Sequence, residues 1–403
     1  MKSLKMRFAS SVPSTVNRRG TAATPVAGGA AHGPRSVSRA VEAAVTGLAG
    51  GAPQLVLVFL AGATEPREAA RQASASAPGA AVAGMTGAAV IGADGPLADG
   101  CSALAFGAGY EVGVGLAEHA SRDPRDAGAR AAAAALKDLD TSRGHTLLLL
   151  FLDARAGDQA EAIAGAYEVA GPRIPLAGGA AAGGQAQLCG GVAHADATVA
   201  VALVSSDPIG LGVAHGCRPW GGASIVTHAD GRTLLRLDGR AATAVYLEQI
   251  GWEEGEHDDF AAVAALNPLA EMELSGGTRL RHVLGSNPDG GLRCAASVPT
   301  NAVVEFTTQT PQTIVESTGQ AVGDALGQLG GRAARGALVF DCAGRRQALS
   351  GEPDGLAREV GALVSALGPA APPIAGLYTR GEVARVRGAK GDENHAVVVV
   401  TFA

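Results

Sequence analysis

The densest cluster of reactive side chains in this chain is Ala214-His-Gly-Cys-Arg-Pro-Trp-Gly221. His215 and Cys217 are two residues apart, so in an extended segment both side chains face the same side. Together with Arg218 they suit a metal or haem ligand set, a nucleophile with its base, or a clamp for an anion. The alternative is a strand end capped by polar residues. We favour it over the enzyme because no third, orienting residue is visible.

A second cluster lies near the carboxyl end, where an apolar run breaks at Gly376 and Gly381 and leaves Tyr378 beside Glu382. Polar groups gathered at a glycine turn suggest a binding site. Arg345 follows another apolar run, which ends at Cys342. A guanidinium there could take a carboxylate by two parallel hydrogen bonds, and Glu382 could take an ammonium group.

We therefore hypothesise that Arg218, Arg345, Tyr378 and Glu382 line one cleft that binds an amino-acid-like ligand. The alternative for Arg345 and Glu382 is a buried salt bridge between the last two strands. Cys342 taken alone is more often a small buried apolar residue than a nucleophile.

The elements that must position these residues repeat three times. Apolar runs begin at Leu55, Thr146 and Ala337, and each is followed by a helix-like stretch, at about 65–77, 157–170 and 354–368. A short apolar strand follows each helix and runs into a glycine turn, which in the second unit contains Gly178 and Gly179. Continuous apolar strands alternating with helices indicate buried strands joined by crossovers. The sequence predicts an α/β fold of two domains, with repeated strand-helix-strand units, mixed sheets and hairpins.

Further strands follow the first two glycine turns. The runs 101–106 and 112–116 resemble 198–203 and 209–213, and we predict a hairpin from each pair. Glycine alternating with branched residues in the second strand of each pair indicates close approach of another backbone or of a ligand. The third unit closes with the apolar strand that follows Asn394, at 395–402.

Composition limits the class of partner. The chain has 403 residues, a net charge of −6, 47% hydrophobic residues and 3% aromatic residues. This balance argues against a nucleic-acid surface, which needs a basic face and stacking aromatics. No apolar run approaches the roughly 20 residues that cross a bilayer, so we expect no membrane contact. The expected partners are a small molecule and a signalling protein.

Neither cysteine nor glycine spacing indicates a cofactor. The five cysteines lie far apart with no Cys-x-x-Cys pair, which favours a reducing compartment over a zinc site or disulfides. The glycines at 178–184 lack dinucleotide spacing, and no Walker lysine follows a glycine loop. We expect no resident cofactor, with haem on His215 as the alternative.

The first forty residues differ from the rest because they carry seven Lys and Arg residues and no acidic residue before Glu42. This composition is typical of a chloroplast or mitochondrial transit peptide. The alternatives are a disordered tail, or an early strand at 7–11 followed by a loop. We therefore expect the fold to start near residue 40, and the protein to be cytoplasmic or organellar.

The order and spacing of several motifs resemble the FIST family. His215-Gly-Cys-Arg-Pro219, the hairpin 226–239 and the helix 241–249 are similar to the end of a FIST amino-terminal domain. The segments 281–284, 338–345 and 375–382 are similar to its carboxy-terminal partner. The resemblance implies a FIST N-like domain at 41–250 and a FIST C-like domain at 251–403, after a tail at 1–40.

What the resemblance implies is a non-catalytic sensory module for small-ligand binding in signal transduction, with an amino acid or related metabolite as ligand. Three alternatives stay open: a haem-binding nitric oxide sensor, a thiol-dependent enzyme that uses Cys217 or Cys342 with His215 as base, and a protein-interaction scaffold of the ubiquitin-ligase adaptor kind. The ligand-binding residues we predict are Gly178, Gly179, His215, Cys217, Arg218, Cys342, Arg345, Tyr378, Gly381, Glu382 and Asn394.

Two motifs depart from the family pattern. The first glycine turn, Gly84-Met-Thr-Gly-Ala-Ala89, lacks the cysteine and acid that the family has there. The pair Asn394-His395 reverses the usual order. We therefore assign no role to the first turn, and Asn394 enters the predicted site only by its position.

Overall fold

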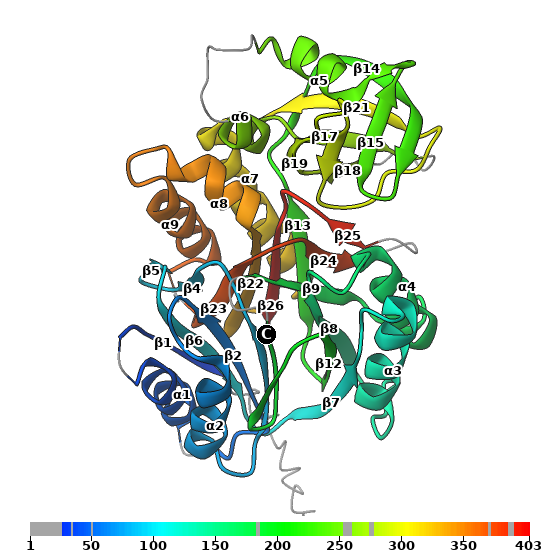
Figure 1. Ribbon diagram of the computed structural model, residues 1–403. Coiled ribbons are helices and arrows are strands. Elements are labelled where there is room, and N and C mark those ends of the chain that lie inside the picture. Colours follow the sequence, from blue (N-terminus) through cyan, green and yellow to red (C-terminus); the bar gives the residue numbers. More distant parts are fainter. Residues whose placement is uncertain are drawn as a thin grey trace, which may run out of the picture.

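The computed structural model describes residues 26–33, 35–49, 51–182, 186–252, 260–273, 278–369, 372–385 and 391–403. Figure 1 shows two parts, a large body of sheets flanked by helices and a smaller lobe above it. The lobe is formed by the described residues between 218 and 308, and the body by the described residues on both sides of that segment. The chain therefore passes between the two parts twice, at 215–217 and at 309–310.

The body contains three copies of one unit, each reading strand, helix, strand, helix, strand, strand. The first copy consists of β1 (Val26–Ala31), α1 (Ser36–Thr46), β2 (Leu55–Ala61), α2 (Pro66–Ser76), β3 (Ala81–Thr86) and β6 (Gly100–Phe106). The second consists of β7 (Tyr110–Glu118), α3 (Pro124–Leu136), β8 (His145–Asp153), α4 (Gln159–Ala170), β9 (Leu176–Ala181) and β12 (Ala197–Ser205). The third consists of β13 (Ile209–Ala214), α7 (Pro311–Gly327), β22 (Gly336–Cys342), α8 (Ala343–Ser350) with α9 (Gly355–Leu367), β23 (Ile374–Thr379) and β26 (Val397–Phe402).

Strand pairing is the same in all three units. The two central strands run parallel, as β2 and β3 do, because a helix crosses between them. The last strand of each unit pairs antiparallel with the first central strand, and the opening strand pairs antiparallel with that last strand. The predicted α/β fold with mixed sheets and repeated strand-helix-strand units is confirmed.

The two predicted hairpins are wrong. β6 pairs with β1 and β2, whereas β7 pairs with β12 in another sheet. In the same way β12 and β13 enter different sheets. Each turn thus joins one unit to the next, and a pair of apolar runs does not reveal whether the chain returns to the same sheet.

Each sheet is completed by two short strands from another unit. β4 (Val90–Gly92) and β5 (Gly95–Leu97) extend the third sheet beside β23. β10 (Gln187–Cys189) and β11 (Val192–His194) extend the first sheet beside β3, and β24 (Glu382–Arg385) and β25 (Asp392–Glu393) extend the second beside β9. This cyclic exchange ties the three units into one body.

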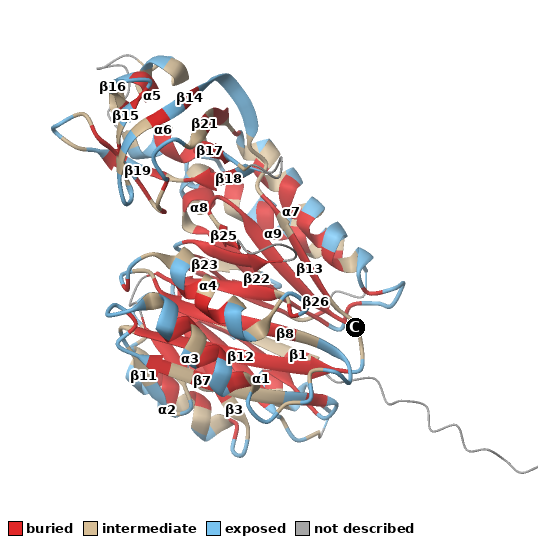
Figure 2. Cartoon of the chain, turned by 90° about the vertical axis from the view of Figure 1, so that its right-hand side faces the viewer, coloured by how far each residue is buried: buried red, intermediate tan, exposed pale blue. Residues whose placement is uncertain are grey.

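The centre of the body is an apolar core enclosed by the three sheets. Phe59, Phe151 and Phe340 come from the first central strand of each unit, and their ring centroids lie 5.7 to 6.2 Å apart. Two of these contacts are edge-on, the geometry that aromatic quadrupoles favour. Figure 2 shows most strands of the body as buried, with intermediate and exposed residues in β1 and β7. The helices cover their outer faces (Figure 1).

The lobe is an antiparallel structure with its own core around Tyr246 and Phe306. Its elements are β14 (Arg218–Asp230), β15 (Thr233–Leu237), β16 (Arg240–Ala241), α5 (Ala242–Ile250), α6 (Phe260–Leu266), β17 (Leu269–Met272), β18 (Thr278–Arg281), β19 (Val283–Ser286), β20 (Leu292–Cys294) and β21 (Val303–Thr308). The expected domain boundary at residue 250 falls inside this lobe, directly after α5. The spatial division of the chain is therefore a body with one inserted lobe.

The fold begins earlier than expected. β1 pairs along its whole length with β6, and α1 buries Val37, Ala40 and Val41. The expectation that the fold starts near residue 40 is therefore wrong. Residues 1–25, with the strand suggested at 7–11, lie outside the described residues. No helix in the described part of the chain combines the length and apolar character needed to span a bilayer.

Candidate functional site

The most reactive residues of the sequence lie in the first of the two crossings between body and lobe. β13 ends at Ala214, and His215-Gly-Cys217 leads into β14. Gly216 has φ +79°, and a Cβ there would collide with the carbonyl oxygen of Thr313 in α7. Only glycine suits this position, because the backbone is left-handed and the helix is in direct contact.

A chain of hydrogen bonds runs from this crossing across the junction. The Cys217 thiol donates to Gln309 Oε1 at 3.2 Å, in the second crossing. Gln309 Nε2 lies 2.8 Å from the carbonyl oxygen of Ala265 and 3.0 Å from His395 Nδ1. His395 Nε2 lies 2.6 Å from Nδ1 of His282, which belongs to the lobe.

This chain fixes the protonation of His395. The bond to a carbonyl oxygen identifies this atom of Gln309, Nε2, as the amide nitrogen, which can only donate hydrogen bonds. His395 Nδ1 faces the same nitrogen and must therefore accept a hydrogen bond from it. The proton of His395 is therefore on Nε2, and it is donated to His282 Nδ1. Burial lowers the pKa of His395 well below its usual value and that of His282 to about 4. Both rings are neutral at physiological pH.

His215 is neutral for related reasons. Its Nδ1 accepts from the Cys217 backbone N–H at 3.0 Å, which places its proton on Nε2. Burial, with the nearby Arg345 guanidinium as a second cause, lowers its pKa. Burial also raises the pKa of the Cys217 thiol to about 12. The crossing thus presents a neutral imidazole and an un-ionised thiol.

A pocket of about 330 Å³ opens beside the crossing. One wall is the segment from Val213 to Arg218, and the other is the first turns of α7. Its polar lining comprises His215, Cys217, Arg218, Thr313, Glu316, Ser317 and Gln320. Arg218 is exposed and makes no ion pair within the described part of the chain, whereas Glu316 accepts one hydrogen bond from Gln312. A cation and an anion therefore face one small polar pocket.

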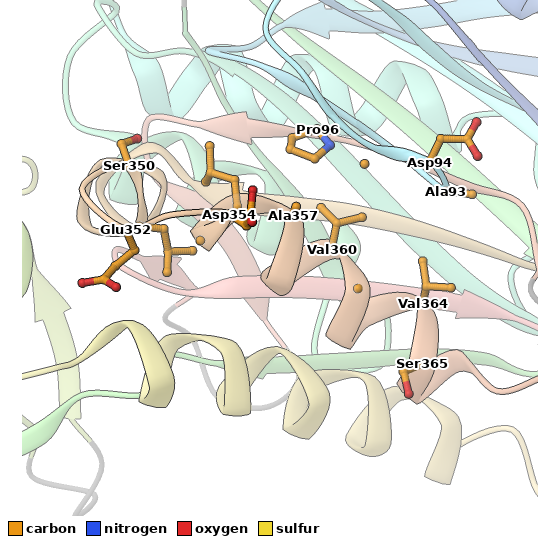
Figure 3. A pocket seen from close by; sticks show the side chains of 15 residues that line it. Ala93, Asp94, Pro96, Ser350, Glu352, Asp354, Ala357, Val360, Val364 and Ser365 are labelled. Atoms are coloured by element: carbon orange, nitrogen blue, oxygen red, sulfur yellow. The ribbon is translucent and has the colours of Figure 1, made fainter.

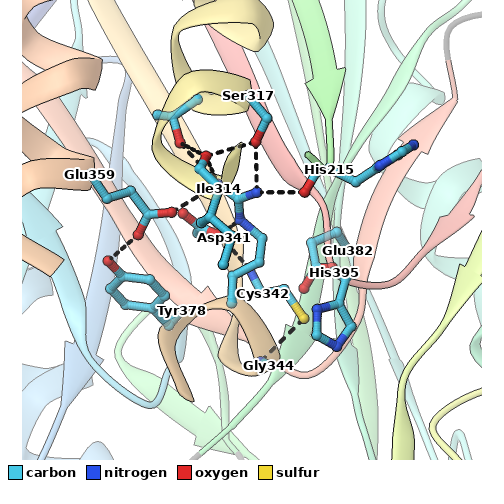
Figure 4. A network of polar contacts seen from close by, with 12 residues as sticks. His215, Ile314, Ser317, Asp341, Cys342, Gly344, Glu359, Tyr378, Glu382 and His395 are labelled. Carbon is cyan, nitrogen blue, oxygen red and sulfur yellow. Dashed lines mark hydrogen bonds and ion pairs between the residues drawn. The ribbon is translucent and has the colours of Figure 1, made fainter. Parts of the chain in front are cut away.

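Arg345 does not line this pocket, because it is completely buried. Figure 4 shows the polar network to which Ser317, Asp341 and Glu359 belong. Its Nε donates to Asp341 Oδ1 at 2.8 Å, and its Nη2 donates to Glu359 Oε1 at 2.8 Å. Its other partners are Ser317 Oγ, Thr318 Oγ1 and the carbonyl oxygens of His215 and Ile314. All five guanidinium N–H groups are engaged, so none remains for a ligand.

Tyr378 belongs to the same network, since its hydroxyl donates to Glu359 Oε2 at 2.9 Å. Glu382 does not: its Oε1 accepts from the Thr379 hydroxyl at 2.8 Å, and it forms no ion pair with Arg345. Burial raises the pKa of Glu382 well above its usual value. The expected cleft lined by Arg218, Arg345, Tyr378 and Glu382 is therefore wrong, and so is the Arg345–Glu382 salt bridge.

Cys342 has a structural environment. Its Sγ accepts from the Gly344 backbone N–H at 3.3 Å, which caps the first turn of α8. Burial, and next the neighbouring Glu382, raise the pKa of its thiol well above the usual value. A thiol held neutral is a poor nucleophile.

The predicted glycines serve backbone packing. A Cβ at Gly178 would collide with the carbonyl oxygen of Leu150, and one at Gly179 would lie 2.8 Å from Thr379 Cγ2. Gly381 has φ +98° and lies against the side chain of Gln159. Gly178 and Gly179 need glycine because strands approach closely, and Gly381 needs it because of its left-handed backbone, so no ligand is required to explain them.

Asn394 is at the junction, where its Oδ1 accepts from the His282 backbone N–H at 3.4 Å. The structure thus brings His215, Cys217 and Arg218 together at the pocket, whereas Asn394 lies at the junction and does not line the pocket. Sequence reasoning missed the α7 wall of the pocket, with Thr313 and Glu316, and it missed Gln309 and His282 at the junction. Gln309 lies 92 residues from Cys217 and His282 lies 113 residues from His395, so no local spacing could have indicated these contacts.

The surroundings of His215 do not fit haem. A haem ligand needs an apolar pocket, whereas polar side chains line most of this one. Within the described residues, no group of three His, Cys, Asp or Glu side chains is arranged to hold a metal ion.

Comparison with known proteins gives the family. The FIST N domain matches residues 54–240, and the FIST C domain matches residues 242–385. This chain belongs to the FIST family. FIST domains are small-ligand sensory domains of signalling proteins. The meeting point of the two FIST matches lies close to the expected boundary at 250, and both run through the lobe.

The similar proteins do not identify a ligand. Uncharacterised proteins from Mycobacterium bovis and Mycobacterium tuberculosis are 29% identical over 185 residues, which is 44% of this chain and 46% of each relative. The chain thus spans about half the length of the curated relatives it matches. The solved structure of a cyanuric acid hydrolase from A. caulinodans is 13% identical, with 94% of this chain and 98% of that chain covered. Its TM-score of 0.35 is too low to support an argument about this FIST protein.

Proposed function

We propose that this protein is a non-catalytic sensor that binds a small zwitterionic metabolite of the amino-acid class in the pocket beside His215-Gly-Cys-Arg218. The observation that carries the proposal is the position of this pocket. Its walls are a crossing between body and lobe and the helix that follows the other crossing. A ligand held there would contact both segments that connect the two parts, so its binding would affect how they are held together.

The lining supports this class of ligand. Arg218 can donate two parallel hydrogen bonds to a carboxylate, and Glu316 can accept hydrogen bonds from an ammonium group. The Nε2–H of His215, with the hydroxyl of Thr313, adds neutral polar contacts. A volume of about 330 Å³ is near the lower limit for small-molecule pockets, which favours a ligand as small as an amino acid.

The environments of the two thiols that could serve as an enzyme's nucleophile favour the sensor instead. Cys217 donates to an amide oxygen, and Cys342 caps a helix. A nucleophilic cysteine needs a lowered pKa, and burial raises it for both. A signalling partner and the cellular compartment remain predictions from the sequence.

The test is a thermal-shift screen of the purified chain against the common amino acids and closely related metabolites. A ligand that binds the folded state raises the melting temperature with increasing concentration. We expect one compound or a small group of compounds to raise the melting temperature. With Arg218→Ala, the same shift should require a ligand concentration about tenfold or more higher. Arg232→Ala, which removes another exposed arginine of the lobe, should leave the effect unchanged. Equal shifts in both variants would refute binding at this pocket.

A further inference from the structure

A groove of about 820 Å³ lies far from the junction pocket in sequence. One wall is the β4–β5 hairpin, from Ala93 to Pro96. The other wall is α9 with the end of α8 (Figure 3). The groove thus lies where a hairpin of the first unit meets a helix of the third.

The α9 wall has the pattern of a helix-binding surface. Leu356, Val360 and Val364 recur every four residues and form an apolar row along the floor of the groove, where Val360 is buried and the other two are half-buried. Ala357, Gly361 and Ser365 form a parallel row of small residues, so a backbone can approach closely. An added Cβ at Gly361 would meet nothing within 4 Å. α9 has 13 residues, which corresponds to about 20 Å of groove, or between three and four helical turns.

The charges along the rim have one sign. Asp94 lies on the hairpin side, and Glu352 and Asp354 lie at the amino-terminal end of α9 (Figure 3). Among the described residues that line the groove there is no lysine, arginine or histidine. An apolar row bordered by three carboxylates is complementary to an amphipathic helix with an apolar stripe and basic flanks.

We propose that this groove docks a basic amphipathic helix of a partner protein. The inner face of α9 gives the docking surface a connection to the rest of the molecule. Glu359 of α9 accepts from Arg345, and Arg345 Nη1 donates to the carbonyl oxygen of His215 at 3.1 Å. Two buried residues, Glu359 and Arg345, therefore link the groove helix to the crossing beside the ligand pocket. This link would carry a signal from the ligand pocket to the groove only if the proposed function holds. Docking of a helix in the groove does not depend on the proposed function.

The probe is a fluorescent helical peptide of about 18 residues, made of leucine, alanine and lysine, with lysines flanking a leucine stripe. Its control has glutamate at every lysine position. Anisotropy titrations with the whole chain, without any small ligand, should show binding of the lysine peptide that weakens as salt is added. The glutamate peptide should bind at least about tenfold more weakly.

Two substitutions locate the binding. Gly361→Leu fills the groove at an open helical position, and we expect it to weaken lysine-peptide binding about tenfold or more. Gly323→Leu makes the same change at an exposed, equally open position of α7 and should leave binding unchanged. Asp94→Asn combined with Glu352→Gln should weaken binding and flatten its salt dependence, while the melting temperature stays near that of the wild type.

Failure of the lysine peptide to bind, or equal binding to both leucine variants, would overturn the proposal. Sedimentation of the chain alone tests a second copy as occupant. Self-association that Gly361→Leu abolishes would show that another copy fills the groove, which would also overturn a basic partner helix. None of these results depends on a small ligand, so they leave the proposed function to its own test.

Discussion

His395 Nε2 of the body lies 2.6 Å from His282 Nδ1 of the lobe, and both rings are neutral. Protonation of either ring would place a second proton in this contact or a positive charge beside the guanidinium of Arg345. The same guanidinium helps to hold the pKa of His395 low. The junction between body and lobe is therefore sensitive to acid.

We predict that His282 contributes stability near neutral pH that is lost as the pH falls. Its pKa is about 4 in the folded chain and about 6.5 when unfolded, so the unfolded state binds more protons between these values. Between pH 7 and pH 5 this group alone should lower the free energy of unfolding by about 2 kcal/mol. Urea unfolding of the wild type and of His282→Asn at both pH values gives the free energy of unfolding of each protein. Subtracting the pH dependence of the variant from that of the wild type removes the opposing effect of the buried carboxyl groups, because both proteins contain them.

His145→Asn is the control for this prediction, because His145 is exposed. It should show the pH dependence of the wild type. If His282→Asn did so too, the neutral histidine pair would not contribute to the acid sensitivity.

Glu393 should have the opposite pH dependence. Burial, and next the charge of Asp392, raise its pKa to about 8. An acid with a raised pKa costs stability that grows as the pH rises from about 4.5 to about 8, since only the unfolded state ionises there. Glu393→Gln should therefore raise the melting temperature at pH 8 and change it little at pH 4.5. Glu111→Gln, at an exposed position, should leave the melting temperature unchanged at both pH values. A gain from Glu393→Gln that is equal at both pH values would contradict this account.

Arg345 is predicted to contribute strongly to the stability of the fold. Its removal leaves Asp341 and Glu359 buried without their cation, and breaking one partner out of a buried ion pair costs about 3–5 kcal/mol. Arg345→Ala should lower the free energy of unfolding by that amount. Arg358→Ala, which loses only an exposed bond to Gln312, should cost less than about 0.5 kcal/mol. Comparable values for the two variants would mean that the network is not structural.

Thiol labelling should be slow for the native chain. Burial raises the pKa of each of the five cysteines, and Cys101, Cys294 and Cys342 are also inaccessible. We expect the half-buried Cys189 and Cys217 to react first, both more slowly than free cysteine at neutral pH, and all five to react after unfolding. Rapid labelling of Cys217 or Cys342 in the native chain would restore the thiol-enzyme alternative.

The sequence was informative where structure is local. Long apolar strands such as 146–151, the helices between them and the repeat itself follow from hydrophobic runs of a few residues. Strand exchange between units was not predictable, because β4, β10 and β24 are short and their partners lie in other units. For the same reason the inserted lobe was missed: its two crossings, at 215–217 and 309–310, are separated by the whole lobe.

The site divides in the same way. His215, Cys217 and Arg218 were found because they are adjacent in sequence, and the structure keeps them at one pocket. Arg345 and Glu382 have the right chemistry for a ligand, but each finds its partners within the chain. Burial of a charged residue with its counter-charge depends on tertiary packing, which residue type and turn position do not reveal.

The central claim is that a small ligand binds between the 213–218 segment and the first turns of α7. Hydrogen–deuterium exchange with and without the amino acid that gives the largest thermal shift tests it most directly, because bound ligand slows local opening. We predict added protection at 213–218 and 311–320, with little change in the helices that cover the first two units. Protection confined to other segments, or no amino acid that shifts the melting temperature, would contradict the account.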